Sequence, residues 1–237
     1  MKKLIFLLGV MSFLIFPSCN KDDPKPKISQ IPSDMKIAFP DESFRNYVLA
    51  NFDRDKNGVI SEDEAIKVTE VQVRGKNIKS LEGIQYFPNL EILDCSYNQL
   101  TTLDVLKNTA LTELQCQGNL LNSLDVSKNA ALTELYCQGN RLTSLDVSGC
   151  TALTMLSCSL NQLATLDVSK NTALTELHCW DNKLTTLDVS WNTELNKLKC
   201  NMSSLMLLYV SKNAVIDGIT KNRRTEYINS ITEIVYE

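Results

Sequence analysis

The stretch LTELYCQGNRLTSLDVSGCTA, residues 132–152, decides the fold because it recurs along the chain. Copies begin at six leucines spaced 21 residues apart, Leu90, Leu111, Leu132, Leu153, Leu174 and Leu195. An earlier stretch from Val68 has the same apolar spacing but begins 22 residues before the next copy. A fixed period of this size indicates a solenoid, in which each copy forms one coil that stacks on its neighbours.

Within each copy, the alternation of apolar and polar residues predicts two short extended segments. In Leu93-Asp94-Cys95, the fourth and sixth residues of the copy point inward and the fifth points outward, as in a strand. A second apolar pair, Leu103 and Val105, repeats this alternation on the opposite side of the coil. We therefore expect a β-rich solenoid with two extended walls and little helix.

The pattern L-x-x-L-x-C-x-x-N-x-L-x-x-L-D-V-S-x-N resembles the leucine-rich repeat, with cysteine in place of the third leucine. The resemblance covers seven repeats over residues 68–216 and implies a right-handed coil with a parallel sheet on its concave face. The asparagine at the ninth position, Asn98 in the first regular copy, is expected to satisfy backbone groups in the turn after the sheet strand.

The sixth-position cysteines are predicted to be reduced thiols that fill a narrow core, Cys95, Cys116, Cys137, Cys158, Cys179 and Cys200. Strands about 4.8 Å apart hold neighbouring Cβ atoms farther apart than the roughly 3.8 Å of a disulfide, so bridging would be strained. A buried cysteine packs as a small apolar residue. Cys150 replaces an asparagine in a turn, and we interpret it as a harmless substitution.

The amino terminus predicts the compartment. Residues 1–18 resemble a bacterial lipoprotein signal peptide, with a charged start, an apolar run and a small residue before Cys19. The resemblance implies that Cys19 is lipidated and anchors the protein in the outer membrane of a Gram-negative bacterium, facing the cell surface. Residues 19–38 are rich in Pro, Lys and Asp and predict a flexible tether. Their Asp22-Asp23 pair is either a surface-export tag or simply a solvated charge pair.

Residues 39–67 predict a small helical cap that covers the first coil, with Asp41 as the N-cap of a helix over 42–52. Residues 53–64, DRDKNGVISEDE, match the twelve-residue EF-hand calcium loop, with Gly58 at the sharp bend. The predicted calcium ligands are Asp53, Asp55, Asn57, Val59 through its carbonyl, Ser61 and Glu64. The cap resembles those of surface leucine-rich-repeat proteins such as the internalins, and the ion is expected to be structural. The alternative is a carboxylate-rich turn that holds Mg²⁺ or no ion.

Residues 217–237 are predicted to form a C-terminal cap, with a final strand within 231–236. A basic cluster, residues 221–224, is expected to protect an open sheet edge from self-association.

The outward residues of the predicted concave face vary from copy to copy, as expected of a recognition surface. Acidic residues dominate the early and middle coils, and lysines and large groups follow in the later ones. The candidate ligand-binding residues are Tyr97, Glu134, Tyr136, Glu176, His178, Trp180, Asp181, Lys197, Lys199 and Met202. Seventh-position residues such as Gln117 and Gln138 are also expected to face outward. A protein is the predicted ligand, because exposed aromatic residues anchor protein interfaces. A glycan stacked on Trp180 and a purely structural envelope role are the alternatives.

The residue types and motifs present in the sequence disfavour catalysis and nucleic-acid binding. His178 is the only histidine, and the thiol of Cys179 should point to the opposite face, so a Cys-His pair is not expected. The sequence contains no Gly-rich phosphate loop, HExxH or GxSxG, and its net charge of -4 disfavours nucleic acid as a partner. We expect a monomeric binding protein and not an enzyme. The outward aspartate column on the opposite wall is predicted to be a solvated ladder rather than a cation site, Asp104, Asp125, Asp146, Asp167 and Asp188.

Overall fold

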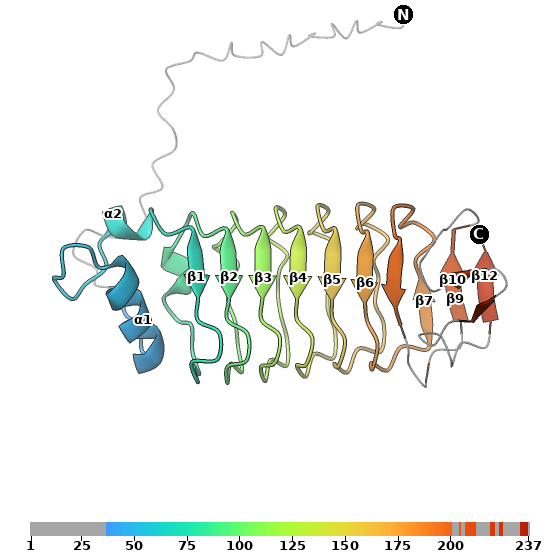
Figure 1. Ribbon diagram of the computed structural model, residues 1–237, viewed down its shortest axis with the longest axis horizontal. Coiled ribbons are helices and arrows are strands. Elements are labelled where there is room, and N and C mark those ends of the chain that lie inside the picture. Colours follow the sequence, from blue (N-terminus) through green and yellow to red (C-terminus); the bar gives the residue numbers. More distant parts are fainter. Residues whose placement is uncertain are drawn as a thin grey trace, which may run out of the picture.

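The computed structural model describes residues 37–200, 204 and 207–211, together with the backbone of residues 219–220, 223–224 and 233–236. The chain is an elongated solenoid with a helical cap at one end of the stack (Figure 1). Among the described residues, no helix is both long and apolar enough to cross a membrane. The predictions for residues 1–36, including the signal peptide and most of the tether, lie outside the described residues.

One wall of the solenoid is a parallel sheet of seven short strands, one from each repeat. Each strand occupies the third to fifth positions of its copy, and register is kept without slippage, as in the pairs Leu114↔Leu135 and Leu135↔Leu156. The strands are β1 (Glu70–Gln72), β2 (Ile92–Asp94), β3 (Glu113–Gln115), β4 (Glu134–Tyr136), β5 (Met155–Ser157), β6 (Glu176–His178) and β8 (Lys197–Lys199). This arrangement confirms the predicted fold class, and it makes each repeat position a straight column along the stack.

The core is a set of such columns, made by the leucines and the sixth-position cysteines, which are fully or almost fully buried. Each buried leucine contributes about 1.5–3 kcal/mol through the hydrophobic effect. Two asparagine columns line the turns. In the first, the Asn140 side chain donates to the carbonyls of Cys116 and Cys137 and accepts from the N–H of Leu121, each at 3.0 Å. Asn140 therefore bonds two neighbouring coils together, as the prediction for this position requires.

The opposite wall, which we call the far wall, differs from the prediction of a second continuous extended wall. Apart from one isolated bridge, Asp104↔Asp125, its described residues form no ladder before β7 (Thr186–Asp188). Each aspartate of the outward column instead accepts the backbone N–H two residues further on, as Asp125 does from Ser127 at 2.9 Å. These hydrogen bonds lower the pKa of Asp125. They give the column the structural role predicted for it, and they replace strand pairing in this wall.

The cap consists of α1 (Glu42–Phe52) and α2 (Glu62–Ala65). Helix α2 ends at Ala65, before the predicted end of the helical cap at residue 67. Asp41 is the N-cap of α1, because its Oδ1 accepts from the N–H of Phe44 at 3.0 Å. Its Oδ2 accepts from the N–H of Lys79 at 2.8 Å, so the same carboxylate also attaches the cap to the first coil. The Tyr47 hydroxyl accepts from the N–H of Gln72 at 2.9 Å, at the edge of β1. A short 3₁₀ helix, η1 (Ile84–Tyr86), lies in the second half of the first repeat.

Toward the C-terminus, the described strands after β8 do not join the seven-stranded sheet, and a separate three-stranded sheet forms in the far wall. Strand β9 (Leu207–Val210) pairs with β7, and β12 (Glu233–Tyr236) pairs with β9, both parallel. Strands β10 (Ile219–Thr220) and β11 (Arg223–Arg224) form an antiparallel pair. The final strand predicted within 231–236 is therefore present as β12, while the role of the basic cluster stays a prediction.

Candidate functional site

The outward surface of the seven-stranded sheet, called here the sheet face, is acidic over its middle coils. Glu113 and Glu134 occupy paired positions on β3 and β4, so two carboxylates lie on adjacent strands. The Tyr136 hydroxyl donates to Glu134 Oε2 at 2.7 Å. Partial burial, this hydrogen bond and the nearby charge of Glu113 raise the pKa of Tyr136 well above its ordinary value. Tyr136 is therefore a neutral hydrogen-bonding aromatic group fixed at the centre of the face.

The later coils carry a mixed cluster around Glu176. Its Oε1 lies 2.5 Å from Lys197 Nζ and 2.5 Å from His178 Nε2. The histidine contact lacks hydrogen-bond geometry, so we do not count it as a bond. Burial and the positive charge of Lys199 lower the pKa of His178 despite the carboxylate beside it. Because the ordinary value is already near 6.5, the histidine is neutral at pH 7 and the cluster has a net positive charge once Lys199 is included.

The prediction that the seventh residue of each copy faces outward is wrong for most of the described copies, because these side chains are not freely exposed. Gln117 and Ser159 are buried and Gln138 is half-buried, since each side chain lies between its counterparts in neighbouring coils. The buried atoms Gln117 Oε1, Gln138 Oε1 and Ser159 Oγ have no hydrogen-bond partner among the described residues. Three consecutive coils thus hold unpaired polar atoms along one margin of the sheet face.

The exposure of Ser157, the fifth residue of the copy that contains β5, also differs from the prediction. Ser157 was predicted to be outward and accessible, but it is buried. It pairs with Tyr136 on one side and with His178 on the other, and these larger side chains shield it.

The eighth residues that the structure describes adopt the left-handed backbone conformation, including three that are not glycine: Tyr97, Leu160 and Asp181, each with φ of 54°. This conformation is costly for residues with a Cβ. The ring of Tyr97 lies against Gly118, and the guanidinium of Arg74 lies 4.3 Å from the ring centroid. Tyr97 is thereby held at the margin of the face with 54% of its surface exposed.

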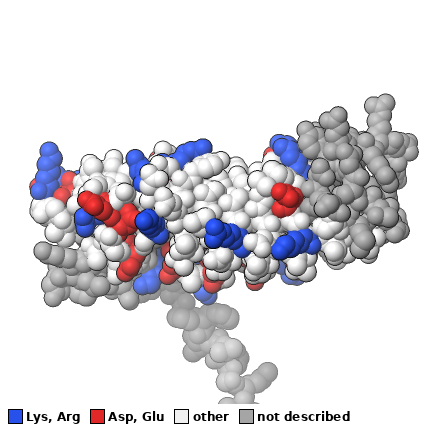
Figure 2. Space-filling model, turned by 90° about the horizontal axis from the view of Figure 1, so that it is seen from below, with Lys and Arg blue, Asp and Glu red and all other residues white. Residues whose placement is uncertain are grey.

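Charges elsewhere on the molecule are more evenly mixed. Seen from below (Figure 2), the coloured part of the stack presents basic side chains spaced along the coils and acidic ones mostly toward the cap, with uncharged surface between them. Trp180 and Asp181 are exposed, and Lys197 and Lys199 are half-buried on β8. The structure thus places nine of the ten candidate ligand-binding residues along the sheet face or its margin, while Met202 lies outside the described residues.

The sixth-position cysteines are free and buried, in agreement with the predicted core role. Burial raises the pKa of the Cys158 thiol to about 12, so the thiolate form is negligible at neutral pH. Cys150 is also buried, and its Sγ contacts the carbonyl of Val126 at 3.4 Å in place of an asparagine amide. Burial raises its pKa to about 11. Neither set of thiols has the properties of a reactive site.

The cap loop brings together the three carboxylates that the calcium pattern predicts. Oxygen atoms of Asp53, Asp55 and Glu64 all lie within 4.8 Å of one another. Asp53 accepts from the N–H of Gly58 at 2.8 Å, and Gly58 has the positive φ, 80°, that the bend requires. Asn57 Oδ1 accepts from the N–H of Val59 at 2.8 Å. These bonds fold the loop around its own carboxylates.

Glu64 closes this loop from α2. Its Oε1 accepts from the N–H of Arg54 at 2.7 Å, and its Oε2 accepts from the N–H and the hydroxyl of Ser61 at 2.9 and 2.8 Å. The hydrogen bonds from Ser61 and Arg54, opposed by some desolvation, lower the pKa of Glu64 to about 2. Although Glu64 is only 6% exposed, it is therefore ionised, and the loop holds three negative charges in close proximity. Hard oxygen ligands in this arrangement suit a divalent cation such as Ca²⁺.

Sequence reasoning missed a column of threonines at the second position of four consecutive copies, Thr112, Thr133, Thr154 and Thr175. The Thr133 hydroxyl donates to the carbonyl of Thr112 at 3.0 Å, and Thr154 and Thr175 repeat the contact one coil further on each time. The recurrence of threonine at this position was the available signal. The column is structural, because each bond joins adjacent coils beside the sheet.

The parallel sheet, the buried cysteine and asparagine columns and the covered first coil define a leucine-rich-repeat solenoid. Over 71 residues the chain is 40% identical to internalin J of Listeria monocytogenes serotype 4b (strain F2365), a match covering 30% of this chain and 8% of that protein. No model of a known protein family matches the chain.

Two solved structures are similar to the chain. The leucine-rich repeat domain of APL1B matches with a TM-score of 0.50 and 20% identity, over 62% of this chain and 49% of that one. The functional domain of InlJ from Listeria monocytogenes, which includes a cysteine ladder, is 28% identical with a TM-score of 0.38, over 84% of this chain and 60% of that one. The chain thus spans less than two thirds of the length of each of these relatives.

Proposed function

We propose that the protein recognises another protein through its sheet face. The observation that carries this proposal is the half-buried ring of Tyr136, whose hydroxyl is fixed by a hydrogen bond to Glu134 Oε2 in the acidic middle of the face. An aromatic side chain that is already fixed loses little further conformational freedom when a protein ligand packs against it. Large side chains at the later coils add apolar anchors, and Trp180 is the largest of them.

The charges of the sheet face suggest what the partner presents. Glu113 and Glu134 lie on the middle strands, and Lys197 and Lys199 close the face at β8. A partner with a basic segment opposite β3 and β4 and an acidic one opposite β8 would match both ends. The complementary order of charges would also fix the direction in which the partner lies along the stack.

The test is a binding screen of the purified protein against arrays of extracellular proteins and of glycans. We expect a protein hit whose affinity falls by about tenfold or more in the Tyr136→Ala/Trp180→Ala double variant, since interface aromatics of this kind are common hot spots. Lys128→Ala, an exposed far-wall variant, is the matched control and should bind normally. A protein hit indifferent to the double variant, or the absence of any protein hit, contradicts the proposal.

Carbohydrate capture is the second candidate for the same face. Trp180 and Asp181 are exposed neighbours, and His178 is half-buried on the preceding strand. An aromatic ring beside polar acceptors can stack on a sugar and bind its hydroxyls. Hits confined to the glycan array and lost in the double variant would favour this candidate over protein recognition.

We infer that the cap loop binds a structural calcium ion. Asp53, Asp55 and Glu64 would supply carboxylate oxygens, and Asn57, Ser61 and the carbonyl of Val59 would complete the set by position in the loop. The ion would offset the mutual repulsion of the carboxylates. Because Asp41 and Tyr47 join the cap to the first coil, an ordered loop would stabilise that end of the solenoid.

We further propose that the protein is anchored in the outer membrane through lipid on Cys19, with its solenoid at the cell surface. The support is the sequence of residues 1–19 alone. Expression with radiolabelled palmitate should label the wild-type protein, and Cys19→Ala should abolish both the label and fractionation with membranes. Labelling that persists in Cys19→Ala would overturn the anchor.

A further inference from the structure

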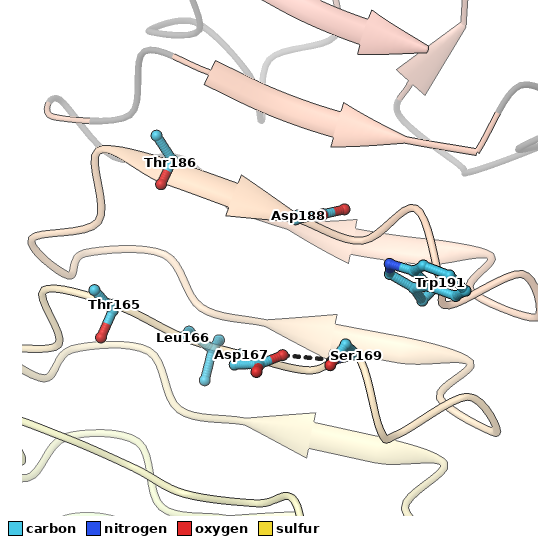
Figure 3. A pocket seen from close by; sticks show the side chains of 7 residues that line it. All are labelled: Thr165, Leu166, Asp167, Ser169, Thr186, Asp188 and Trp191. Carbon is cyan, nitrogen blue, oxygen red and sulfur yellow. Dashed lines mark hydrogen bonds between the residues drawn. The ribbon is translucent and has the colours of Figure 1, made fainter. Parts of the chain in front are cut away.

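A hollow on the far wall has features that the recognition of a partner by the sheet face does not use. It has a volume of about 380 Å³ and is formed between the fourth and fifth regular coils. Its lining residues are Thr165, Leu166, Asp167, Ser169, Thr186, Asp188 and Trp191 (Figure 3). The volume falls in the range of about 300–1,000 Å³ that is usual for small-molecule sites.

Trp191 departs from the repeat pattern at this hollow. The same position holds lysine in four other copies, Lys107, Lys128, Lys170 and Lys212. Trp191 is 64% exposed, the largest exposed fraction among the large apolar side chains that the structure describes. Packing therefore does not explain the tryptophan, because most of its surface contacts no part of the described chain. In Figure 3 the indole lies at one end of the hollow and the two threonines lie at the other.

The aspartates provide hydrogen-bond acceptors between these ends. Asp167 Oδ1 accepts from the N–H of Ser169, and Asp188 Oδ1 accepts from the N–H and the hydroxyl of Ser190. Their hydrogen bonds with the described residues use Oδ1 alone, so each Oδ2 is available to a ligand. Hydrogen bonding to serine also holds both carboxylates in fixed orientations, one coil apart.

A second aromatic residue extends the surface. Tyr209 pairs with Asp188 in the parallel ladder of β9 and β7, so it continues the outward aspartate column by one coil. It is half-buried, and its neighbours Leu208 and Val210 point inward. Asp188 is thus bordered by Tyr209 along its column and by Trp191 along its own coil.

From this arrangement we propose that the far-wall hollow binds a neutral oligosaccharide. A sugar ring presents an apolar face that can stack on Trp191, and hydroxyls that can donate to Asp167 and Asp188. The hydroxyls of Thr165 and Thr186 can both donate and accept, which suits a polyhydroxylated ligand. A single guanidinium group from a partner protein would satisfy the carboxylates, but it would neither fill the hollow nor accept hydrogen bonds from the threonine hydroxyls, because it carries donors only.

The experiment is a titration of the full chain with the neutral oligosaccharides that bind it on a glycan array, followed by calorimetry. Trp191→Lys restores the residue of four other copies, so the variant should fold normally, and circular dichroism checks this. We expect it to weaken saccharide binding by about tenfold or more, as loss of an aromatic anchor does. Asp188→Asn should also weaken binding, whereas Asp125→Asn, in the same column three coils away, should not.

Three results would overturn the proposal. One is the absence of any neutral oligosaccharide hit on the array, and another is saccharide binding that Trp191→Lys leaves unchanged. The third is binding of an arginine-rich peptide, with no saccharide binding, that depends on Trp191 and Asp188. Loss of binding in Tyr136→Ala/Trp180→Ala with no effect of Trp191→Lys would assign the sugar to the sheet face, which keeps this test separate from that of the proposed function.

Discussion

Asn140→Ala is expected to lower the free energy of unfolding by about 3–5 kcal/mol. The Asn140 side chain is 9% exposed and makes three hydrogen bonds, to the carbonyls of Cys116 and Cys137 and from the N–H of Leu121. Alanine leaves all three backbone groups buried without this partner, and each such group costs about 1–3 kcal/mol, reduced where water can enter. Urea unfolding followed by far-UV circular dichroism measures the loss.

Two matched variants separate this effect from that of the substitution itself. Asn122→Ala makes the same change at an exposed position of the preceding copy, and we expect a shift within about 0.5 kcal/mol. Asn182→Ala removes the same three kinds of hydrogen bond at a half-buried position, so an intermediate loss is expected. If Asn140→Ala were as mild as Asn122→Ala, the asparagine column would not be holding adjacent coils together.

The period of 21 residues allowed most of the solenoid to be predicted from sequence. Once the copies are stacked in register, the identity of each column follows, and the inward positions of leucine, cysteine and asparagine were assigned correctly. The far wall was not predicted correctly, because alternation of Leu103 and Val105 reports which side faces the core and not whether strands pair. In the far wall, aspartate side chains accept hydrogen bonds from backbone N–H groups that a β-ladder would otherwise have used.

The candidate sites were predicted less completely, since exposure depends on the neighbouring coil as much as on the residue. Ser157 and Gln117 have outward positions but are shielded by larger or closely stacked neighbours. Trp191 lay outside the predicted sites because the candidate ligand-binding residues were taken from the concave face alone, and the signal was its replacement of lysine. The grouping of Asp53, Asp55 and Glu64 in the cap loop was predictable, because their spacing is local in sequence and needs no knowledge of packing.

Calcium is expected to raise the melting temperature of the protein by about 5–10 °C relative to the protein in EDTA. Extracellular calcium modules bind with Kd values near 10⁻⁴ M at the tighter end of their range. Calcium at about 10 mM is then about 100 times Kd and stabilises the folded state by about 2.7 kcal/mol. For a domain of this size each kcal/mol shifts the melting temperature by about 2–4 °C. Differential scanning calorimetry at matched ionic strength measures the shift.

The decisive comparison is between two neighbouring acidic residues of the cap. Glu64→Gln removes a carboxylate that lies within 4.8 Å of Asp53 and Asp55, whereas Glu62→Gln removes one that is exposed and outside that cluster. Glu64→Gln also weakens the bonds to Ser61 and Arg54, so its melting temperature in EDTA should fall. The quantity to compare is therefore the increment that calcium adds to each variant. We expect Glu62→Gln to keep the full increment and Glu64→Gln to lose it, because a neutral amide cannot provide the bidentate carboxylate of the twelfth loop position. An equal increment in both variants, or none in the wild-type protein, would falsify the structural calcium site.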